Sequence, residues 1–184
     1  MTRFLVIGVI AYISSVVALT LAYSAEQEAM SEIEHSFLQK AAQGHYAKVA
    51  LGQLAVQKAS HNQVKQHGAR MIEDHQKVAE GVRKLTSQGG TPLPSQLSMQ
   101  HQQIQQKLSQ LSGKDFDIAY ISFMVGDHVQ DVGEMEQGAK TLTDPRVQQW
   151  TASTLPLLKD HLEQVKAVAR TIGVNENDAS KVKE

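Results

Sequence analysis

Three histidines occupy comparable places in the sequence, and each directly follows an aspartate. Each lies near the middle of a long segment with helical apolar spacing, so a helix bundle would bring the three imidazoles to one level of its core. Neutral imidazoles from three helices suit a borderline divalent cation such as zinc, copper or iron, with a fourth position left for water. The aspartates would orient neighbouring rings as hydrogen-bond acceptors. The histidines are His75, His128 and His161, and the aspartates are Asp74, Asp127 and Asp160.

The same residues allow two interpretations without a metal. A helical core tolerates one polar layer, whose histidines bond to one another, to the aspartates or to buried water and so set the register of the helices. Lys48, at the matching position of the first helix, favours this interpretation, because an ammonium group repels a cation and would pair with one of the aspartates. Alternatively, clustered imidazoles resist protonation together, so acid would loosen the core.

The histidine-bearing segments are bounded by residues that typically begin helices. Ser31 forms a capping pattern with Glu34 before the first helix, and Asp144 is a favoured cap for the fourth. Ser60 and Asp115 are predicted to cap the second and third helices. Four long helices therefore follow from the pattern of apolar residues and caps together.

Short linkers at residues 59–60 and 142–144 would make two helical hairpins, and a longer stretch with its own small helix would join them. This layout predicts an all-α fold over residues 31–173: a ferritin-like antiparallel four-helix bundle with a short extra helix in the long crossover. Glycines inside the helices, Gly52 and Gly68 among them, are interpreted in part as points where two backbones approach closely.

The first 24 residues are predicted to be a secretory signal peptide. Arg3 precedes an apolar run over residues 4–22, and the small residues Ala22 and Ser24 permit cleavage after Ser24. The run is also long enough to span a bilayer, so an inner-membrane anchor over residues 4–22 is the alternative. Either way the remaining chain is expected outside the cytoplasm, in the periplasm if the leader is cut. Residues 174–184 are polar and are predicted to form a disordered tail.

The composition excludes several classes of function. The 184 residues carry 18 basic and 19 acidic side chains and no cysteine, which excludes thiolate metal sites and gives no charge excess for nucleic acid. A ferritin-type di-iron centre needs a glutamate three residues before a histidine, but Ile72 and Leu158 stand there. No activated nucleophile occurs, so no catalytic residues are assigned and a non-enzymatic role is predicted. The other histidines are expected to be exposed or capping: His35, His45, His61, His67 and His101.

An ordered set of residues between positions 37 and 170 resembles a known family. The set comprises Phe37, Ala41-Ala42-Gln43-Gly44, Leu54-Ala55, Met71 with Asp74-His75, Ser112-Gly113 before Phe116-Asp117 and Tyr120, His128, and Leu155-Pro156 with His161-Leu162. It is similar to a family of bacterial exported proteins filed as a domain of unknown function (family forty-one forty-two) and often labelled as outer membrane proteins. The resemblance implies a ferritin-like fold, export, and a glutamate where this chain has Lys48.

Two functional hypotheses follow from these observations. The first is an exported, non-enzymatic helical bundle with an envelope or stress-related role. The second is a metal-binding or metal-buffering bundle that uses His75, His128 and His161. The partner and the oligomeric state are left open by the sequence.

Overall fold

The computed structural model describes residues 30–175, and this part of the chain is helical. Its helices are α2 (Glu32–Lys58), α3 (Asn62–Gly89), α4 (Met99–Ser109), α5 (Gly113–Thr141) and α6 (Pro145–Ile172). Within this range, β-type pairing is confined to an isolated bridge between Ala59 and Gly113. The predicted leader, residues 1–24, and residues 176–184 of the predicted tail lie outside the described residues.

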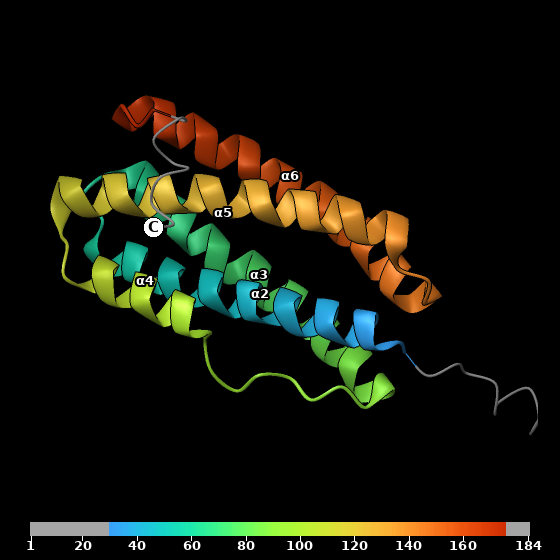
Figure 1. Cartoon of the computed structure of the whole chain (residues 1–184). Coiled ribbons are helices and arrows are strands. Elements are labelled where there is room, and N and C mark those ends of the chain that lie inside the picture. Colours follow the sequence, from blue (N-terminus) through green and yellow to red (C-terminus); the bar gives the residue numbers. More distant parts are fainter. Residues whose placement is uncertain (1–29, 176–184) are drawn as a thin grey trace, which may run out of the picture. The chain divides into compact units, whose positions relative to one another are not determined.

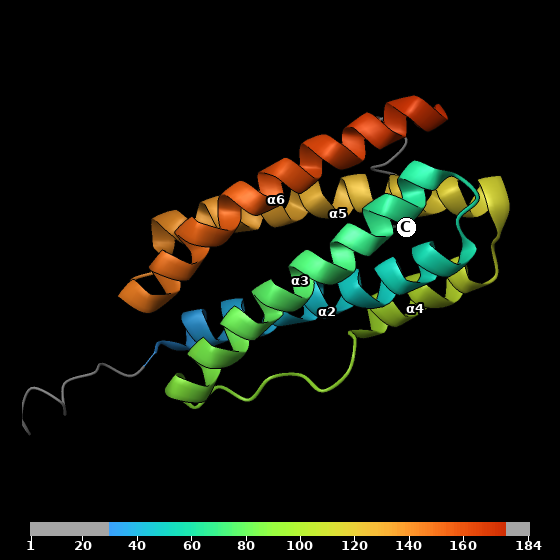
Figure 2. The same ribbon diagram turned by 180° about the vertical axis from the view of Figure 1, so that it is seen from behind.

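The four long helices form two antiparallel hairpins that pack side by side, as Figures 1 and 2 show from opposite sides. Helix α2 packs chiefly against α3, and α5 packs chiefly against α6; α3 also contacts α6, and α2 also contacts α5. The short helix α4 lies in the crossover between the hairpins and packs on α2 and α5. The predicted all-α bundle with an extra crossover helix is therefore confirmed.

Each hairpin linker is held by a carboxylate from the other hairpin. Glu34, in the first turn of α2, accepts a hydrogen bond of 2.9 Å from the backbone N–H of Thr143 and another from Asp144 in the α5–α6 linker. Asp117, in the first turns of α5, accepts from the backbone N–H groups of Ser60 and His61 in the α2–α3 linker, at 3.0 and 2.9 Å. Because each linker is bonded to the other hairpin, these contacts fix the position of one hairpin relative to the other along the bundle axis.

The predicted caps are correct at two of the four helices. The reciprocal Ser31–Glu34 capping box is present, and Asp144 caps α6 by accepting from the backbone N–H of Arg146 at 2.8 Å. The prediction for Ser60 is wrong, because its hydroxyl donates to Asp117 and the cap of α3 is His61.

The start of α5 also differs from the prediction. The helix begins at Gly113, ahead of Asp115, and Ser112 is its N-cap. Gly113 has a φ of +60°, a left-handed conformation that glycine adopts without steric cost, so the chain turns into the helix two residues before the predicted cap.

Helices α2 and α3 approach closely at two facing glycines. A Cβ atom added at Gly52 would lie 2.7 Å from the carbonyl oxygen of Gly68, and one added at Gly68 would lie 2.7 Å from the Cβ of Ala55. The interpretation of Gly52 and Gly68 as close-approach points is therefore confirmed. The main apolar cluster extends from Ala55 at this contact and includes Leu51, Val64, Phe116, Tyr120, Ile121, Met124 and Val165. It also takes in Val174, the first residue of the predicted tail.

Candidate metal centre

The structure brings His75 of α3, His128 of α5 and His161 of α6 together in the middle of the bundle, and each of them is 0% exposed. The ring centroids are 5.2 Å apart for His75 and His161, 5.8 Å for His128 and His161, and 5.9 Å for His75 and His128. One ring nitrogen from each histidine lies within 4.8 Å of one from each of the others. The three imidazoles thus share one cross-section of the core.

Hydrogen bonds at the outer nitrogens of two rings determine which nitrogen carries the proton. His128 Nδ1 lies 2.9 Å from the carbonyl oxygen of Met124, and His161 Nε2 lies 2.9 Å from the Asp74 carboxylate. Both partners can only accept, so these nitrogens donate. The other nitrogen of each neutral ring then carries a lone pair. His128 Nε2 and His161 Nδ1 are buried and have no hydrogen-bond partner within the described residues.

The third ring, His75, is joined to a fourth imidazole. The Nδ1 atoms of His75 and His45 lie 2.9 Å apart, so one of the two must donate to the other. If His75 donates, its buried and unpartnered Nε2 carries a lone pair, as in the other two rings. If His45 donates, His75 Nε2 carries a hydrogen. Only the first arrangement gives three convergent ligand atoms.

Burial keeps these imidazoles neutral. It lowers the pKa of His75 and His128 well below the ordinary value of 6.5, and it also lowers the pKa of His161, although the Asp74 carboxylate acts in the opposite direction. Neutral imidazole is the form that binds metal ions. The site therefore needs no deprotonation at neutral pH before it accepts a cation.

Lys48 lies beside the histidine layer, but its charge is paired. The side chain is 1% exposed, and Nζ lies 2.6 Å from carboxylate oxygens of both Asp127 and Asp131. Burial alone would lower the pKa of Lys48, but the two carboxylates outweigh it and raise the pKa above its usual value. Burial and the Asp127 charge raise the pKa of Asp131 to about 6, despite Lys48. A buried ion pair of this kind reduces the expected repulsion of a cation by Lys48.

Of the three aspartates predicted to orient the rings, Asp74 bonds to an imidazole, that of His161. Asp127 binds Lys48, and Asp160 accepts from Arg70 at 2.9 Å and from a glutamine on its own helix. Within residues 30–175, neither Asp127 nor Asp160 bonds to the ring of His75, His128 or His161. The rotation of about 100° from the inward histidine is the same for all three aspartates, so the outcome depends on the neighbouring helix: Asp127 meets Lys48 of α2 and Asp160 meets Arg70 of α3.

Two further histidines were expected to be exposed or capping, and the structure corrects this expectation. His45 and His67 are 2% and 5% exposed, and burial lowers the pKa of each to about 3. His45 contacts His75, while the His67 ring lies 6.3 Å from that of His128 and its Nδ1 lies 3.3 Å from the Tyr120 hydroxyl. Helix α2 therefore contributes His45 to the polar core, one turn before Lys48.

The sequence carried a periodicity signal for His67, whereas the spacing of His45 acquires its meaning only in the fold. His45 follows Glu34 by eleven positions, and His128 follows Asp117 by the same eleven. Because α2 and α5 run antiparallel, these equal spacings are counted from opposite ends of the bundle and leave His45 about four residues, roughly one helical turn, from the level of His128. His67 lies four residues before the buried Met71, which is the spacing of one helix face. Among the remaining histidines, His61 caps α3 as expected.

The fold and its core define an antiparallel, ferritin-like helical bundle with a buried cluster of histidines. The chain belongs to the family described as a domain of unknown function (DUF4142), which it matches over residues 20–168. No match to the chain was found among curated proteins. Within the described residues, no helix combines the length and apolar character needed to cross a membrane.

Two solved structures share this fold. One, from Streptomyces coelicolor, is described as a secreted protein of the DUF305 family; it has 13% sequence identity and a TM-score of 0.66, covering 76% of this chain and 92% of that chain. The other is a DUF305 fragment from Deinococcus radiodurans, with 14% identity and a TM-score of 0.68, covering 79% of this chain and 99% of that chain. At these identities the likeness shows the fold alone.

Proposed function

We propose that this protein is an exported, non-enzymatic helical bundle that binds one transition-metal ion, of the zinc, copper or iron class, at His75, His128 and His161. The observation that carries the proposal is the set of three buried ring nitrogens without partners, one on each histidine. Buried polar atoms normally find partners, and a group that lacks one needs an explanation. A bound cation would satisfy all three at once.

The spacing of the rings is close to what coordination needs. Three atoms within 4.8 Å of one another lie at most about 2.8 Å from a common centre, whereas zinc binds imidazole nitrogen at about 2.1 Å. Each ring would move inward by less than about 1 Å. The bonds from His128 to a carbonyl oxygen and from His161 to Asp74 are the outer contacts that usually orient metal-binding histidines.

The burial of the rings supports binding rather than catalysis. All three histidines are 0% exposed, so a fourth coordination position would lie inside the packed core and not in an open substrate cleft. The positions that would supply glutamates to a di-iron centre hold Ile72 and Leu158, which argues against oxygen chemistry. A buffering or storage role in the cell envelope fits these constraints. The predicted leader over residues 1–24 supports a periplasmic location.

Metal titration of the purified, chelator-treated protein tests the proposal. We expect one equivalent of zinc or copper per chain by calorimetry, and none in His128→Gln. His67→Gln is the matched control, because it also removes a buried imidazole of the same core but lies outside the proposed ligand set. Circular dichroism of both variants checks that they fold.

Two outcomes would overturn the metal proposal. One is the absence of binding to the folded wild-type protein, with the same melting temperature in chelator and in added metal. The other is equal stoichiometry in wild type and folded His128→Gln. Either result would leave the histidines as a structural polar layer that sets helix register, for which the His45–His75 hydrogen bond is the supporting contact.

A further inference from the structure

A line of polar contacts runs from the surface of the bundle to the proposed metal centre, between α3 and α6. These two helices come from different hairpins and contact each other on the face that Figure 2 presents. The Asp74 carboxylate of α3 lies 2.9 Å from His161 Nε2 of α6, and Arg70 donates to the same carboxylate at 3.2 Å. Arg70 also donates to Asp160 of α6 at 2.9 Å. One guanidinium group therefore joins α3 to α6 directly outside a histidine of the proposed centre.

The exposure of these side chains increases towards the surface. The His161 side chain is 0% exposed, that of Asp74 is 18% exposed, and that of Arg70 is 45% exposed. The hydrogen bonds that His75 and His128 make are themselves buried. Within residues 30–175, the contact with Asp74 is thus the one that links a histidine of the centre to a partly exposed side chain. The link ends at Arg70.

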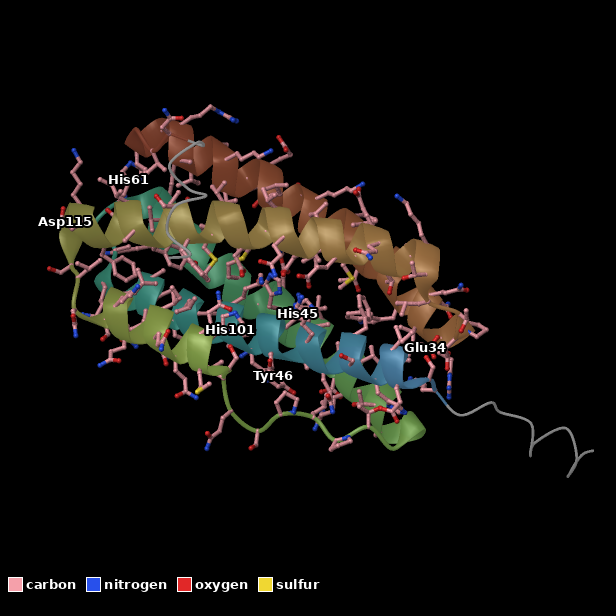
Figure 3. The ribbon with its side chains drawn as sticks, viewed as in Figure 1. Glu34, His45, Tyr46, His61, His101 and Asp115 are labelled. Carbon is pink, nitrogen blue, oxygen red and sulfur yellow. The ribbon has the colours of Figure 1, made fainter. Side chains whose placement is uncertain are left out.

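The opposite side of the centre, between α2 and α5, is closed by a stronger contact. It lies on the side of the bundle where Figure 3 labels His45. There Lys48 is 1% exposed and its Nζ lies 2.6 Å from both Asp127 and Asp131. Separating a buried ion pair is costly, because it leaves charges unpaired inside the protein. The ion pairs of Arg70 are partly exposed, so water can replace them at little cost. An opening between α3 and α6 therefore costs less.

The backbone of α6 is weakened shortly before His161. Pro156 lies inside this helix, five residues before His161, and has no N–H group. The carbonyl oxygen of Ala152 therefore lacks its helical donor. Helices bend most readily at such positions. A small displacement of α6 at this point would separate His161 from Asp74.

We propose that the metal ion enters and leaves the centre between α3 and α6, and that Arg70 is the latch that closes this route. The inference rests on the proposed metal function and adds to it the path of the ion and the residue that controls its rate. When the guanidinium group moves into solvent, Asp74 and Asp160 present two carboxylates beside His161. Carboxylate oxygens bind the same divalent cations as imidazoles, so they can replace part of the water shell of a passing ion. Arg70 acts through Asp74 and lies outside the ligand set.

Stopped-flow measurement of zinc binding, and of zinc release into excess chelator, tests the latch. We expect Arg70→Gln to bind one equivalent of zinc and to take up and release it about three- to tenfold faster than the wild-type protein, because it loses two partly exposed ion pairs. Arg70→Lys should also release zinc faster, since an ammonium group keeps the charge but lacks the fork that bridges two carboxylates. Arg83→Gln is the matched control, because it removes the same charge from the same helix at a residue that pairs with Glu80 within α3.

The two rates distinguish a latch from a simple effect of charge. Loss of a positive charge near the centre would speed uptake of a cation and slow its release, whereas loss of a latch speeds both. The inference is overturned if folded Arg70→Gln releases zinc no faster than the wild-type protein, or if Arg83→Gln changes both rates equally. With one equivalent of zinc still bound, that result leaves the metal proposal intact. Absence of zinc binding to the wild-type protein overturns both proposals.

A second readout needs no metal. The hydrogen on His161 Nε2, which donates to Asp74, should exchange with water faster in Arg70→Gln than in Arg83→Gln, as followed by NMR. Equal exchange in the two variants would show that Arg70 does not hold the contact between Asp74 and His161 closed, and would contradict the latch.

Discussion

Acidification is expected to unfold the metal-free bundle, because its core holds imidazoles that resist protonation. Burial lowers the pKa of His45 and His67 to about 3, against an ordinary value of 6.5, and lowers the pKa of His75 and His128 well below that value. Below pH 6.5 the unfolded chain binds these protons while the folded chain does not. Their contribution to stability is therefore complete above pH 6.5 and is lost as the pH falls towards 3.

The size of the effect follows from these shifts. At pH 5, His45 and His67 each favour unfolding by about 2 kcal/mol, since one pKa unit corresponds to about 1.4 kcal/mol. Asp131 opposes them, because its pKa of about 6 lets the folded chain gain a proton and recover roughly 1 kcal/mol. The net loss from pH 7 to pH 5 is about 3 kcal/mol before His75 and His128 add to it. Typical domains have a total stability of about 5–15 kcal/mol.

Urea unfolding followed by circular dichroism, in chelator at pH 7, 6 and 5, measures this loss. His67→Gln removes one of the buried imidazoles and should reduce the loss of unfolding free energy between pH 7 and pH 5 by about 2 kcal/mol. If the wild-type protein has the same unfolding free energy at pH 7 and pH 5, the imidazoles must take up protons without opening the fold. That result would refute the reasoning from burial.

Three further predictions concern packing, capping and the proposed metal centre. Gly52→Ala should lower the melting temperature, because the added Cβ would lie 2.7 Å from a backbone oxygen of α3. Gly133→Ala is the control: its Cβ would meet nothing within 4 Å, so the substitution should stabilise α5 by about 0.5–1 kcal/mol. Melting temperatures that change in the same direction in both variants would contradict this packing argument. Asp117→Ala should lower the free energy of unfolding, measured with urea, by about 1–3 kcal/mol, because two backbone N–H groups before α3 lose their acceptor. An unchanged urea midpoint would show that water replaces the carboxylate. His45→Ala should weaken zinc binding about 10–100-fold in calorimetry at unchanged stoichiometry, and equal affinity would exclude His45 from orienting the centre.

The sequence predicted those features that depend on neighbouring residues. Asp144 caps α6 through a backbone N–H two residues away, and the capping box of Ser31 and Glu34 spans three residues. The failed cap at Ser60 has a long-range cause, because Asp117 of another helix takes its hydroxyl and its backbone N–H. A residue 57 positions away cannot be identified from local pattern.

The candidate site also combines features that follow from local sequence with features that depend on contacts between distant residues. The inward positions of His75, His128 and His161 follow from helical periodicity, and the structure brings their rings together. The burial of His45 in the histidine cluster was missed because the local sequence around a single histidine does not identify the residue that it contacts on another helix. Its role depends on a contact with His75, thirty residues away on the opposing helix.

By itself, the sequence determined the helical segments, most of their ends, the hairpin order and the face on which each core histidine lies. These properties depend on spacings of a few residues, over which the backbone geometry of a helix is constant. Only the tertiary structure decided which nitrogens are protonated, that Lys48 pairs with Asp127 and Asp131, and that His45 and His67 are buried. Those outcomes depend on the rotation of each helix about its axis and on its height against its neighbours, which are set by packing between segments distant in sequence.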